Sequence, residues 1–379
     1  MVHMDNTPFT VGTQMLTPSG MRQRYLLGRY NYYMYARNSS EFLASMQVSS
    51  TDVYRTMQSG YSELQGVLAG NTKAQDYLKL SQAQASSSMK KLPPFTIRRA
   101  QNISESLGQQ AIVDGFVAKP IYDYIEGGHW NDGPAPYTCL VADNDHVKRN
   151  DDPQYYTDLE WIPPLVKDNY GIEFDLSSEV VQNMDYLNST HYADAIFAIK
   201  FEGFNFKANW TEGQLDIVNT TNKDNLIYPY SNYDRELLIS KLLEQPLYEI
   251  IDLAAGHKES NNETIPYYRL YSAHDTQIAN ILTQLMPDYN YTYIPFASNI
   301  YIEVHQDPRF DDPFDYQIRF VYNGKPMKIG ACADFEGDLC PEKLFISELK
   351  KYIIVGDDKK LYDLCDNNVP PEQTFLTAW

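Results

Sequence analysis

The sequence predicts an α/β protein whose sheet is covered by helices on both faces. The segment Tyr267–Ser272 is typical of a buried β-strand. Apolar residues at helical spacing follow it: Ile278, Ile281, Leu282 and Leu285. Two more strand-like segments, Ile300–Val304 and Tyr316–Tyr322, come next and are separated by an acidic turn. Strands interleaved with helices in this way favour a sheet with a helical layer on each side.

Three further helices are predicted from the spacing of apolar residues. The first spans Leu16–Arg37 and has a broad apolar stripe consisting of Met21, Tyr25, Leu26 and Tyr33. A short extended segment, Ser45–Ser49, leads through Ser50-Thr51-Asp52 into the second helix, which ends near Gly70. The third spans Asp234–Gly256 and contains Pro246, a residue that kinks or interrupts helices.

The length indicates more than one simple domain, because a chain of 379 residues is well above the roughly 150 residues of a typical domain. The readable patterns lie in residues 1–93 and 231–379, which we predict to form an α/β core domain. Residues 94–230 give mixed signals with Gly and Pro turns. We predict that they form a helical cap inserted into the core.

The composition excludes several classes of protein. Lys and Arg total 31 against 50 Asp and Glu, a formal net charge of −19. Binding to nucleic acid or to an anionic membrane surface would favour a basic face, so both are disfavoured. Hydrophobic residues make up 43% of the chain, enough for a packed core, yet no run reaches the 18 apolar residues of a membrane span.

Cysteines and glycosylation motifs point to the secretory pathway. The even set Cys139, Cys332, Cys340 and Cys365 allows three disulfide pairings, and four buried thiols are the alternative. Sequons of the form Asn-x-Ser/Thr begin at Asn38, Asn102, Asn188, Asn209, Asn219, Asn262 and Asn290. Some sequons arise by chance in an Asn-rich chain, so they support the secretory assignment without fixing it.

The clearest candidate for chemistry is the pair His274-Asp275, which sits where a predicted strand gives way to a helix. Ligands of open α/β sheets bind at the carboxyl ends of strands, and helix N-termini favour anions. A His–Asp pair there can hydrogen-bond a phosphate and protonate a leaving group. In the alternative interpretation, Asp275 only caps the helix and His274 is an ordinary turn residue.

Arg55 is the second candidate, because it falls in the first turn of its helix, where the helix dipole disfavours a cation. An anion bound in front of that helix end would compensate, although an exposed arginine without a ligand is the simpler alternative. The remaining histidines have no metal-binding spacing, so neither a metal site nor a cofactor is predicted.

Three segments, taken in order, resemble motifs of one enzyme family. Leu16–Gln23 (LTPSGMRQ) resembles an L-T-x-x-G-M-x-Q helix start. Ser50–Thr56 (STDVYRT) is similar to an R-S-T-D-V-x-R-T motif, with Ser49 in place of its first arginine, and Tyr271–Thr276 matches Y-S-A-H-D-T. By these motifs, the chain is identified as a member of the histidine acid phosphatases, in the branch that includes the prostatic and lysosomal enzymes. The resemblance runs from about Leu16 to Cys365.

The resemblance implies a phosphoglycerate-mutase-like three-layer α/β/α core with a mainly helical cap. It implies metal-free, cofactor-free hydrolysis of small-molecule phosphate monoesters through a phosphohistidine intermediate, and it is compatible with a homodimer. In this scheme Arg55 and His274 bind the transferring phosphoryl group, and Asp275 protonates the departing alcohol. A fixed cation stabilises the charge on the phosphoryl group, and a poor alkoxide leaving group needs an acid.

One family motif is missing. The R-H-G-x-R segment should precede Leu16 and supply the nucleophilic histidine, but the residues before Leu16 contain no Arg-His-Gly and no visible signal peptide. His3 has no arginine beside it and is a poor substitute. We therefore expect a sequence that starts downstream of the true start and a core that lacks its N-terminal strand. A marginally stable product with little turnover would follow.

The resemblance also implies two disulfides, Cys332–Cys340 in a short C-terminal loop and Cys139–Cys365 between the cap region and the C-terminal tail. A bridge that closes such a long loop stabilises by about 4 kcal/mol in the chain-entropy model.

Two other functions stay open at this stage. A catalytically inactive relative would retain Arg55, His274 and Asp275 only to bind phosphate. A phytase-like or inositol-phosphate phosphatase would need extra Lys or Arg around the site, and the cap region is not visibly basic. A lysosomal or secreted location is expected for the enzyme.

Overall fold

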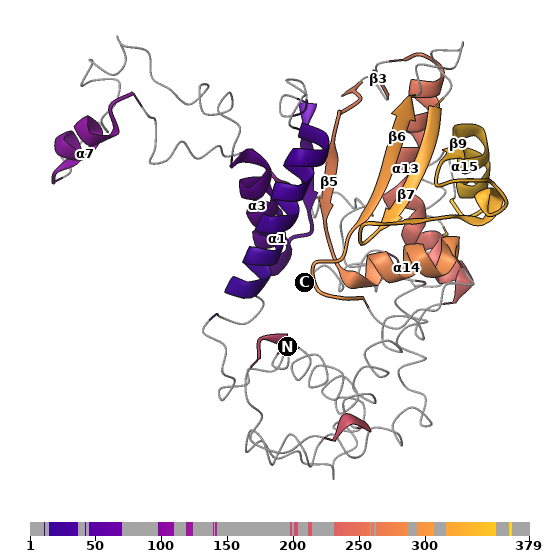
Figure 1. Ribbon diagram of the computed structural model, residues 1–379, viewed down its shortest axis with the longest axis horizontal. Helices are drawn as coiled ribbons and strands as arrows, with labels where there is room; N and C mark the ends of the chain where they lie inside the picture. Colours follow the sequence, from indigo (N-terminus) through magenta and orange to yellow (C-terminus); the bar gives the residue numbers. More distant parts are fainter. Residues whose placement is uncertain are drawn as a thin grey trace, which may run out of the picture.

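Figure 1 shows the computed structural model of the protein. It describes residues 15–36, 45–69, 98–109, 119–123, 231–257, 263–286, 294–306 and 316–353, together with 11, 42, 139, 141, 198, 201–203, 211–213, 259–260 and 364–365. The described residues form a mixed α/β fold, so the predicted fold class is confirmed.

A parallel sheet of three strands leads directly into the segments that carry the predicted site residues. Its strands, in the order β2-β1-β5, are β2 (Tyr122–Asp123), β1 (Gln47–Ser50) and β5 (Arg269–Ser272). The register places Ser50 opposite Ser272 of β5 and Asp123 of β2. Because parallel strands point the same way, the chain leaves β1 and β5 at the same edge of the sheet.

A second, antiparallel sheet lies toward the C-terminus. It consists of β6 (Ile300–Gln306), β7 (Tyr316–Tyr322) and β8 (Lys325–Met327), with β9 (Cys340–Pro341) paired to β7. Asn323 and Gly324 connect β7 to β8 with φ of 48° and 74°, the backbone of a tight hairpin turn. A small antiparallel pair, β3 (Glu259–Ser260) and β4 (Glu263–Thr264), precedes β5.

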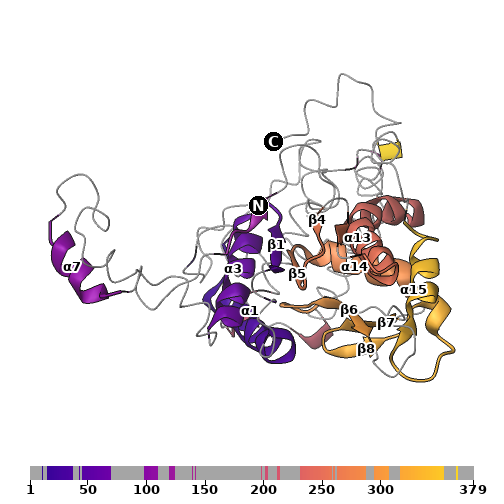
Figure 2. The same cartoon turned by 90° about the horizontal axis from the view of Figure 1, so that it is seen from above.

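Helices lie on both sides of the β1–β5 pair (Figure 2). One side has α1 (Pro18–Asn31), continued by a π-helical turn (Tyr32–Ala36), and α3 (Tyr54–Leu68). The other has α13 (Asn232–Ala254), α14 (Asp275–Leu285) and α15 (Glu342–Leu349). The main hydrophobic core fills the space between α13, α14, α15 and the antiparallel sheet. No helix in the described part of the chain combines the length and apolar character of a membrane span.

The contact face of α1 differs from the predicted apolar stripe. Leu26 and Tyr33 are 59% and 57% exposed, whereas Gly28 and Asn31 are the buried residues of this helix. Gly28 lies against the backbone of α3 at Gly66, so the two helices approach backbone to backbone. The prediction was wrong because a crossing made of glycines leaves no apolar pattern in the sequence.

A buried polar network joins α1, α3 and β6. The Glu63 carboxylate accepts a hydrogen bond from Asn31 Nδ2 at 2.8 Å and lies 3.5 Å from Arg24 Nη1. Tyr301 of β6 donates to Asn31 Oδ1 at 2.8 Å. Burial raises the pKa of Glu63 despite the nearby Arg24 guanidinium, so this carboxyl depends on its partners to remain in the core.

The long helix α13 begins at a capping box in which Ser231 Oγ accepts from Asp234 N–H at 3.1 Å and Asp234 Oδ2 accepts from Ser231 N–H at 2.7 Å. The helix runs through Pro246 to Ala254, so the predicted interruption does not end it. Most of the predicted cap, 94–230, lies outside the described residues. The part of the cap that is described consists of α7 (Ala100–Leu107), β2 and short or isolated stretches. The division into core and cap therefore stays a prediction.

Both disulfides implied by the resemblance are present. Cys139 pairs with Cys365 at a Cα–Cα distance of 4.8 Å, and Cys332 pairs with Cys340 at 5.6 Å. Both distances fall in the usual range for disulfides. The first bridge joins residues that are 226 positions apart in the sequence, whereas the second joins residues only 8 positions apart.

Removing the long-range bridge is expected to destabilise the protein more than removing the short one. In the chain-entropy model the Cys139–Cys365 bridge contributes about 5 kcal/mol or slightly more and the Cys332–Cys340 bridge about 2–3 kcal/mol. Urea unfolding of the Cys139→Ala/Cys365→Ala and Cys332→Ala/Cys340→Ala variants measures the difference. Equal losses of unfolding free energy would contradict the prediction.

Candidate functional site

The three predicted site residues lie at the same edge of the parallel sheet. After β1 the chain turns into α3, whose second residue is Arg55. After β5 it turns into α14, with His274 as N-cap and Asp275 as the first helical residue. Because β1 and β5 are paired in register, the two helices begin side by side, and both present N-terminal N–H groups at this edge.

Hydrogen bonds fix the His274-Asp275 junction. The backbone N–H of His274 donates to Gln277 Oε1 at 3.0 Å, and the N–H of Thr276 donates to Asp275 Oδ1 at 3.0 Å. The imidazole Nε2 of His274 lies 2.9 Å from Thr51 Oγ1, which comes from the end of β1. Both the backbone and the ring of His274 are therefore held in place.

The charge of Arg55 acts on both residues of the pair. Burial, reinforced by the positive charge of Arg55, lowers the pKa of His274 from 6.5 to about 4. The imidazole is therefore neutral at mildly acid pH while no anion is bound. An anion between Arg55 and His274 would offset both effects and favour the protonated ring.

Asp275 shifts in the opposite direction. The residue is open to solvent, yet protein surrounds its carboxyl closely enough that desolvation raises the pKa. The Thr276 N–H and the Arg55 guanidinium oppose this rise but do not overcome it. A carboxyl that stays protonated to higher pH than usual and still reaches solvent is suited to act as a general acid.

The sequence motifs did not reveal the hydroxyl groups beneath the site. Thr51, 1% exposed, contacts Thr56 as well as His274: its Oγ1 lies 2.8 Å from Thr56 Oγ1. Ser272 Oγ donates to the carbonyl of Thr56 at 2.6 Å and so ties the end of β5 to the start of α3. The available signal was the position of Thr51 and Ser272 at strand ends inside the family-like motifs.

Together these groups have the charge and hydrogen-bonding capacity to bind a tetrahedral anion. Arg55 supplies a cation, α3 and α14 supply the positive ends of two helix dipoles, and His274 supplies a ring that can gain a proton. Asp275 adds a carboxyl with a raised pKa. This combination suits the binding of a phosphoryl group and the protonation of an oxygen attached to it.

The low pKa of His274 predicts a loss of stability in acid. Between pH 6.5 and about 4 the unfolded chain binds a proton at this histidine and the folded chain does not, so unfolding becomes easier as the pH falls through that range. The pKa difference between 6.5 and about 4 corresponds to roughly 3 kcal/mol. Denaturant unfolding at pH 4 and pH 7 tests this: the His274→Gln variant should lose less stability in acid than the wild type.

The exposed His257 is a matched control, since its side chain is 64% exposed. Replacing it with glutamine should leave the pH dependence of unfolding close to that of the wild type. Identical pH profiles for the wild type and His274→Gln would contradict the assignment of the acid-sensitive group.

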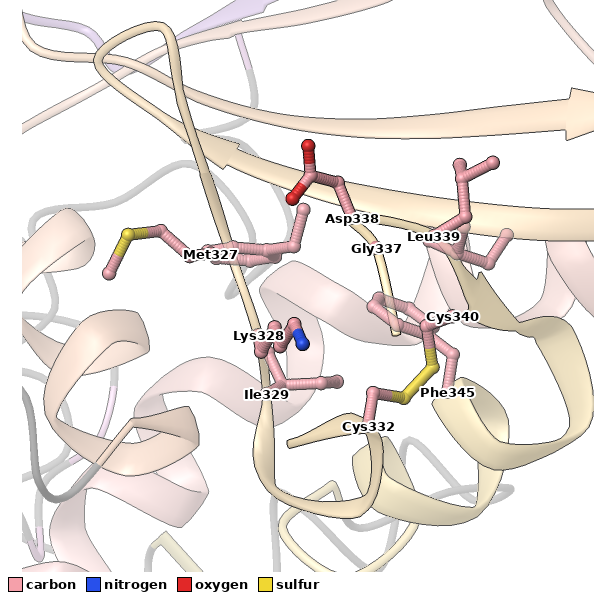
Figure 3. A pocket seen from close by; sticks show the side chains of 11 residues that line it. Met327, Lys328, Ile329, Cys332, Gly337, Asp338, Leu339, Cys340 and Phe345 are labelled. Carbon is pink, nitrogen blue, oxygen red and sulfur yellow. A yellow bond between two sulfur atoms is a disulfide. The ribbon is translucent and has the colours of Figure 1, made fainter. Parts of the chain in front are cut away.

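The other sequence predictions concern residues away from this edge. His3 lies outside the described residues. In the described part of the chain, no group of three or more His, Cys, Asp or Glu side chains is placed to hold a metal ion. A small pocket lies beside the Cys332–Cys340 bridge (Figure 3), lined mainly by apolar residues of β7 and the short loop, and Arg55, His274 and Asp275 do not line it.

Comparison with solved structures supports the fold. The phytase of Citrobacter braakii is similar with a TM-score of 0.56 and 11% identity, covering 92% of this chain and 90% of the phytase. The apo phytase of Hafnia alvei gives a TM-score of 0.53 and 13% identity, covering 93% and 92%. The phytase of Klebsiella sp. ASR1 gives 0.50 and 14%, covering 92% and 86%. No curated protein matches the sequence.

Comparison with family models agrees with the motifs. One model, described as "Histidine phosphatase superfamily (branch 2)", matches residues 3–106 and 188–323. The two matched ranges include α1, α3 and the His274-Asp275 junction, and they span more than half of the chain. The chain therefore belongs to the histidine phosphatase superfamily, branch 2.

Proposed function

We propose that this protein is a phosphatase of the acid phosphatase type, which acts on phosphate monoesters of small molecules. Arg55 and His274 bind the phosphoryl group, and Asp275 protonates the oxygen of the departing alcohol. The observation that carries the proposal is the convergence of these three residues, from two helix N-termini, at one edge of the parallel sheet. Neither helix supplies all three groups, so a chance cap or a lone surface arginine explains the arrangement poorly.

The charge states support these roles. Arg55 is positive, and His274 can become positive once an anion offsets its burial, so both can neutralise a phosphoryl group. The raised pKa of Asp275 favours the protonated form of its carboxyl, which is the form a general acid needs. The proposal therefore predicts better phosphate binding at mildly acid than at alkaline pH.

The chemistry also needs a nucleophile. In the family scheme a histidine of an R-H-G-x-R segment attacks phosphorus, and the printed sequence has no such segment. We propose that efficient hydrolysis in this family proceeds through a phosphohistidine intermediate. We also propose that this chain, which has no R-H-G-x-R segment, binds phosphate but hydrolyses esters slowly. A non-catalytic, phosphate-binding role is the limiting form of this proposal.

Two measurements on the full chain test the proposal. Calorimetric titration with inorganic phosphate at pH 5 should give saturable binding of one phosphate per chain, and absence of binding would overturn the proposal. Hydrolysis of an aryl phosphate at the same pH should be slow. Fast hydrolysis that survives replacement of every histidine except His274 would refute the account of the missing nucleophile.

A phytase-like activity is the second candidate, favoured by the fold shared with three phytases. It is the less supported one, because polyphosphorylated substrates need several cations and the chain has a net charge of −19. Competition between inositol hexakisphosphate and inorganic phosphate separates the two candidates. Binding of the hexakisphosphate at least tenfold tighter than phosphate would favour the phytase-like activity.

We also propose a lysosomal or secreted location. The Cys139–Cys365 and Cys332–Cys340 bridges support it, since disulfides form in oxidising compartments. Glycosylation of the sequons would follow from passage through that pathway. A loss of mass after enzymatic removal of N-glycans from the protein made in its own host checks this, and an unchanged mass would contradict it.

A further inference from the structure

We propose that Thr51 is a positioning residue that fixes the tautomer of His274, with the ring hydrogen on Nε2. The motif around Thr51 helped to place the chain in its family, and the contact described above holds the ring of His274, but neither says which ring nitrogen carries the hydrogen. The tautomer follows from the hydrogen bonds that the hydroxyl groups of Thr51 and Thr56 make. Its importance for binding phosphate rests on the proposed function.

The backbone of Thr51 is rigidly held. Its N–H continues the sheet ladder by donating to the carbonyl of Ser272 at 3.3 Å. Its own carbonyl accepts from Ser50 Oγ at 3.0 Å and from Thr56 Oγ1 at 2.9 Å. With only 1% of the residue exposed, the hydroxyl has little access to water and must use its protein neighbours as partners.

The number of hydroxyl hydrogens available decides which group donates in each contact. The single hydroxyl hydrogen of Thr56 is directed at backbone carbonyls, those of Thr51 at 2.9 Å and Val53 at 2.8 Å, which can only accept. Thr56 Oγ1 must then accept from Thr51 Oγ1 across their 2.8 Å contact. This uses the only hydrogen of Thr51.

The oxygen of Thr51 can therefore only accept from His274. The 2.9 Å contact requires a hydrogen on Nε2 of the imidazole. In the neutral ring this leaves Nδ1 as the basic nitrogen, so the proton gained in acid or with a bound anion goes to Nδ1. The chain of hydroxyls thus orients the ring and selects which nitrogen titrates.

This assignment explains why a polar residue is buried at this position. A valine of similar shape would fill the space but would leave Nε2 without a partner, and the ring could then turn or exchange tautomers. A serine would keep the hydroxyl. The two substitutions therefore separate the hydrogen bond from the packing of the side chain.

The direct test is the nitrogen NMR spectrum of the histidine side chains in the full chain, with His274 assigned by loss of its signals in His274→Gln. Above the pKa of His274, the wild type and Thr51→Ser should be mainly Nε2–H, and Thr51→Val should show a larger Nδ1–H fraction. An Nδ1–H ring in the wild type, or an unchanged tautomer in Thr51→Val, would overturn the proposal.

Thr276→Val is the matched control, because Thr276 Oγ1 has no hydrogen-bond partner among the described residues and Thr276 lies two residues from His274. It should leave the tautomer unchanged. Inorganic phosphate binding gives a second readout. Thr51→Val should weaken the binding about fivefold, which corresponds to the usual free-energy contribution of one hydrogen bond. Thr51→Ser should bind phosphate as the wild type does. If the wild type fails to bind phosphate, the proposed function fails while the NMR result still decides the role of Thr51.

Discussion

Replacing Gly66 with alanine is expected to lower the free energy of unfolding by about 3 kcal/mol or more, the upper range for overpacking in a core. A Cβ atom at Gly66 would lie 2.1 Å from the carbonyl oxygen of Tyr25 and 2.9 Å from the amide nitrogen of Arg29. Both atoms belong to the backbone of α1, so no side chain can rotate away. The two helices would have to separate along the crossing.

The same change should weaken phosphate binding, because α3 carries Arg55 at its start. Urea unfolding measures the stability, and calorimetry with inorganic phosphate measures the binding. Gly213→Ala is the matched control, since a Cβ at Gly213 meets no atom of the described residues within 4 Å and Gly213 is not among the described glycines with positive φ. If Gly66→Ala unfolds at the same urea concentration as this control, the close helix crossing is not a feature of the protein.

Replacing Arg55 with glutamine is expected to weaken inorganic phosphate binding about 30-fold to 100-fold, the worth of a charged hydrogen bond. The same substitution should raise the pKa of His274, because the guanidinium is one of the two causes of its depression. The pKa should nevertheless stay below 6.5, since burial is the larger cause and remains. Calorimetry measures the first effect, and an NMR titration of His274 measures the second.

Arg98→Gln removes an equal charge at an exposed position and controls for the overall electrostatic field. It should change phosphate affinity less than twofold, because exposed charges are screened by salt. Equal losses in the two variants would mean that Arg55 acts only through net charge. An unchanged pKa of His274 in Arg55→Gln would mean that the two residues do not share a site.

The elements around His274 could be predicted because their patterns are local. An apolar run, a His-Asp junction and apolar residues at helical spacing give β5 and α14, and β7 matches its predicted bounds, Tyr316–Tyr322. The likeness to family motifs then assigned roles to Arg55, His274 and Asp275 across more than 200 residues. No local pattern could have joined them.

Other features depend on contacts that leave no such trace. The strand β2 has only two residues, Tyr122 and Asp123, and exists because β1 lies beside it. The α1–α3 crossing depends on Gly28 and Gly66, whose importance is visible only when the helices are placed together. The hydroxyl of Thr51 acquires its partner from a residue 223 positions away.

The pairing of β1 with β5 has a consequence for how such a protein can diversify. Arg55 follows the end of β1 at Ser50 by five residues, and Asp275 follows the end of β5 at Ser272 by three, so the groups proposed to bind phosphate stay next to the strand pair whatever the length of the loops between β1 and β5. Insertions, deletions and new surface loops can accumulate there at small entropic cost. New leaving-group preferences can thus evolve without disturbing the residues proposed to bind the phosphoryl group.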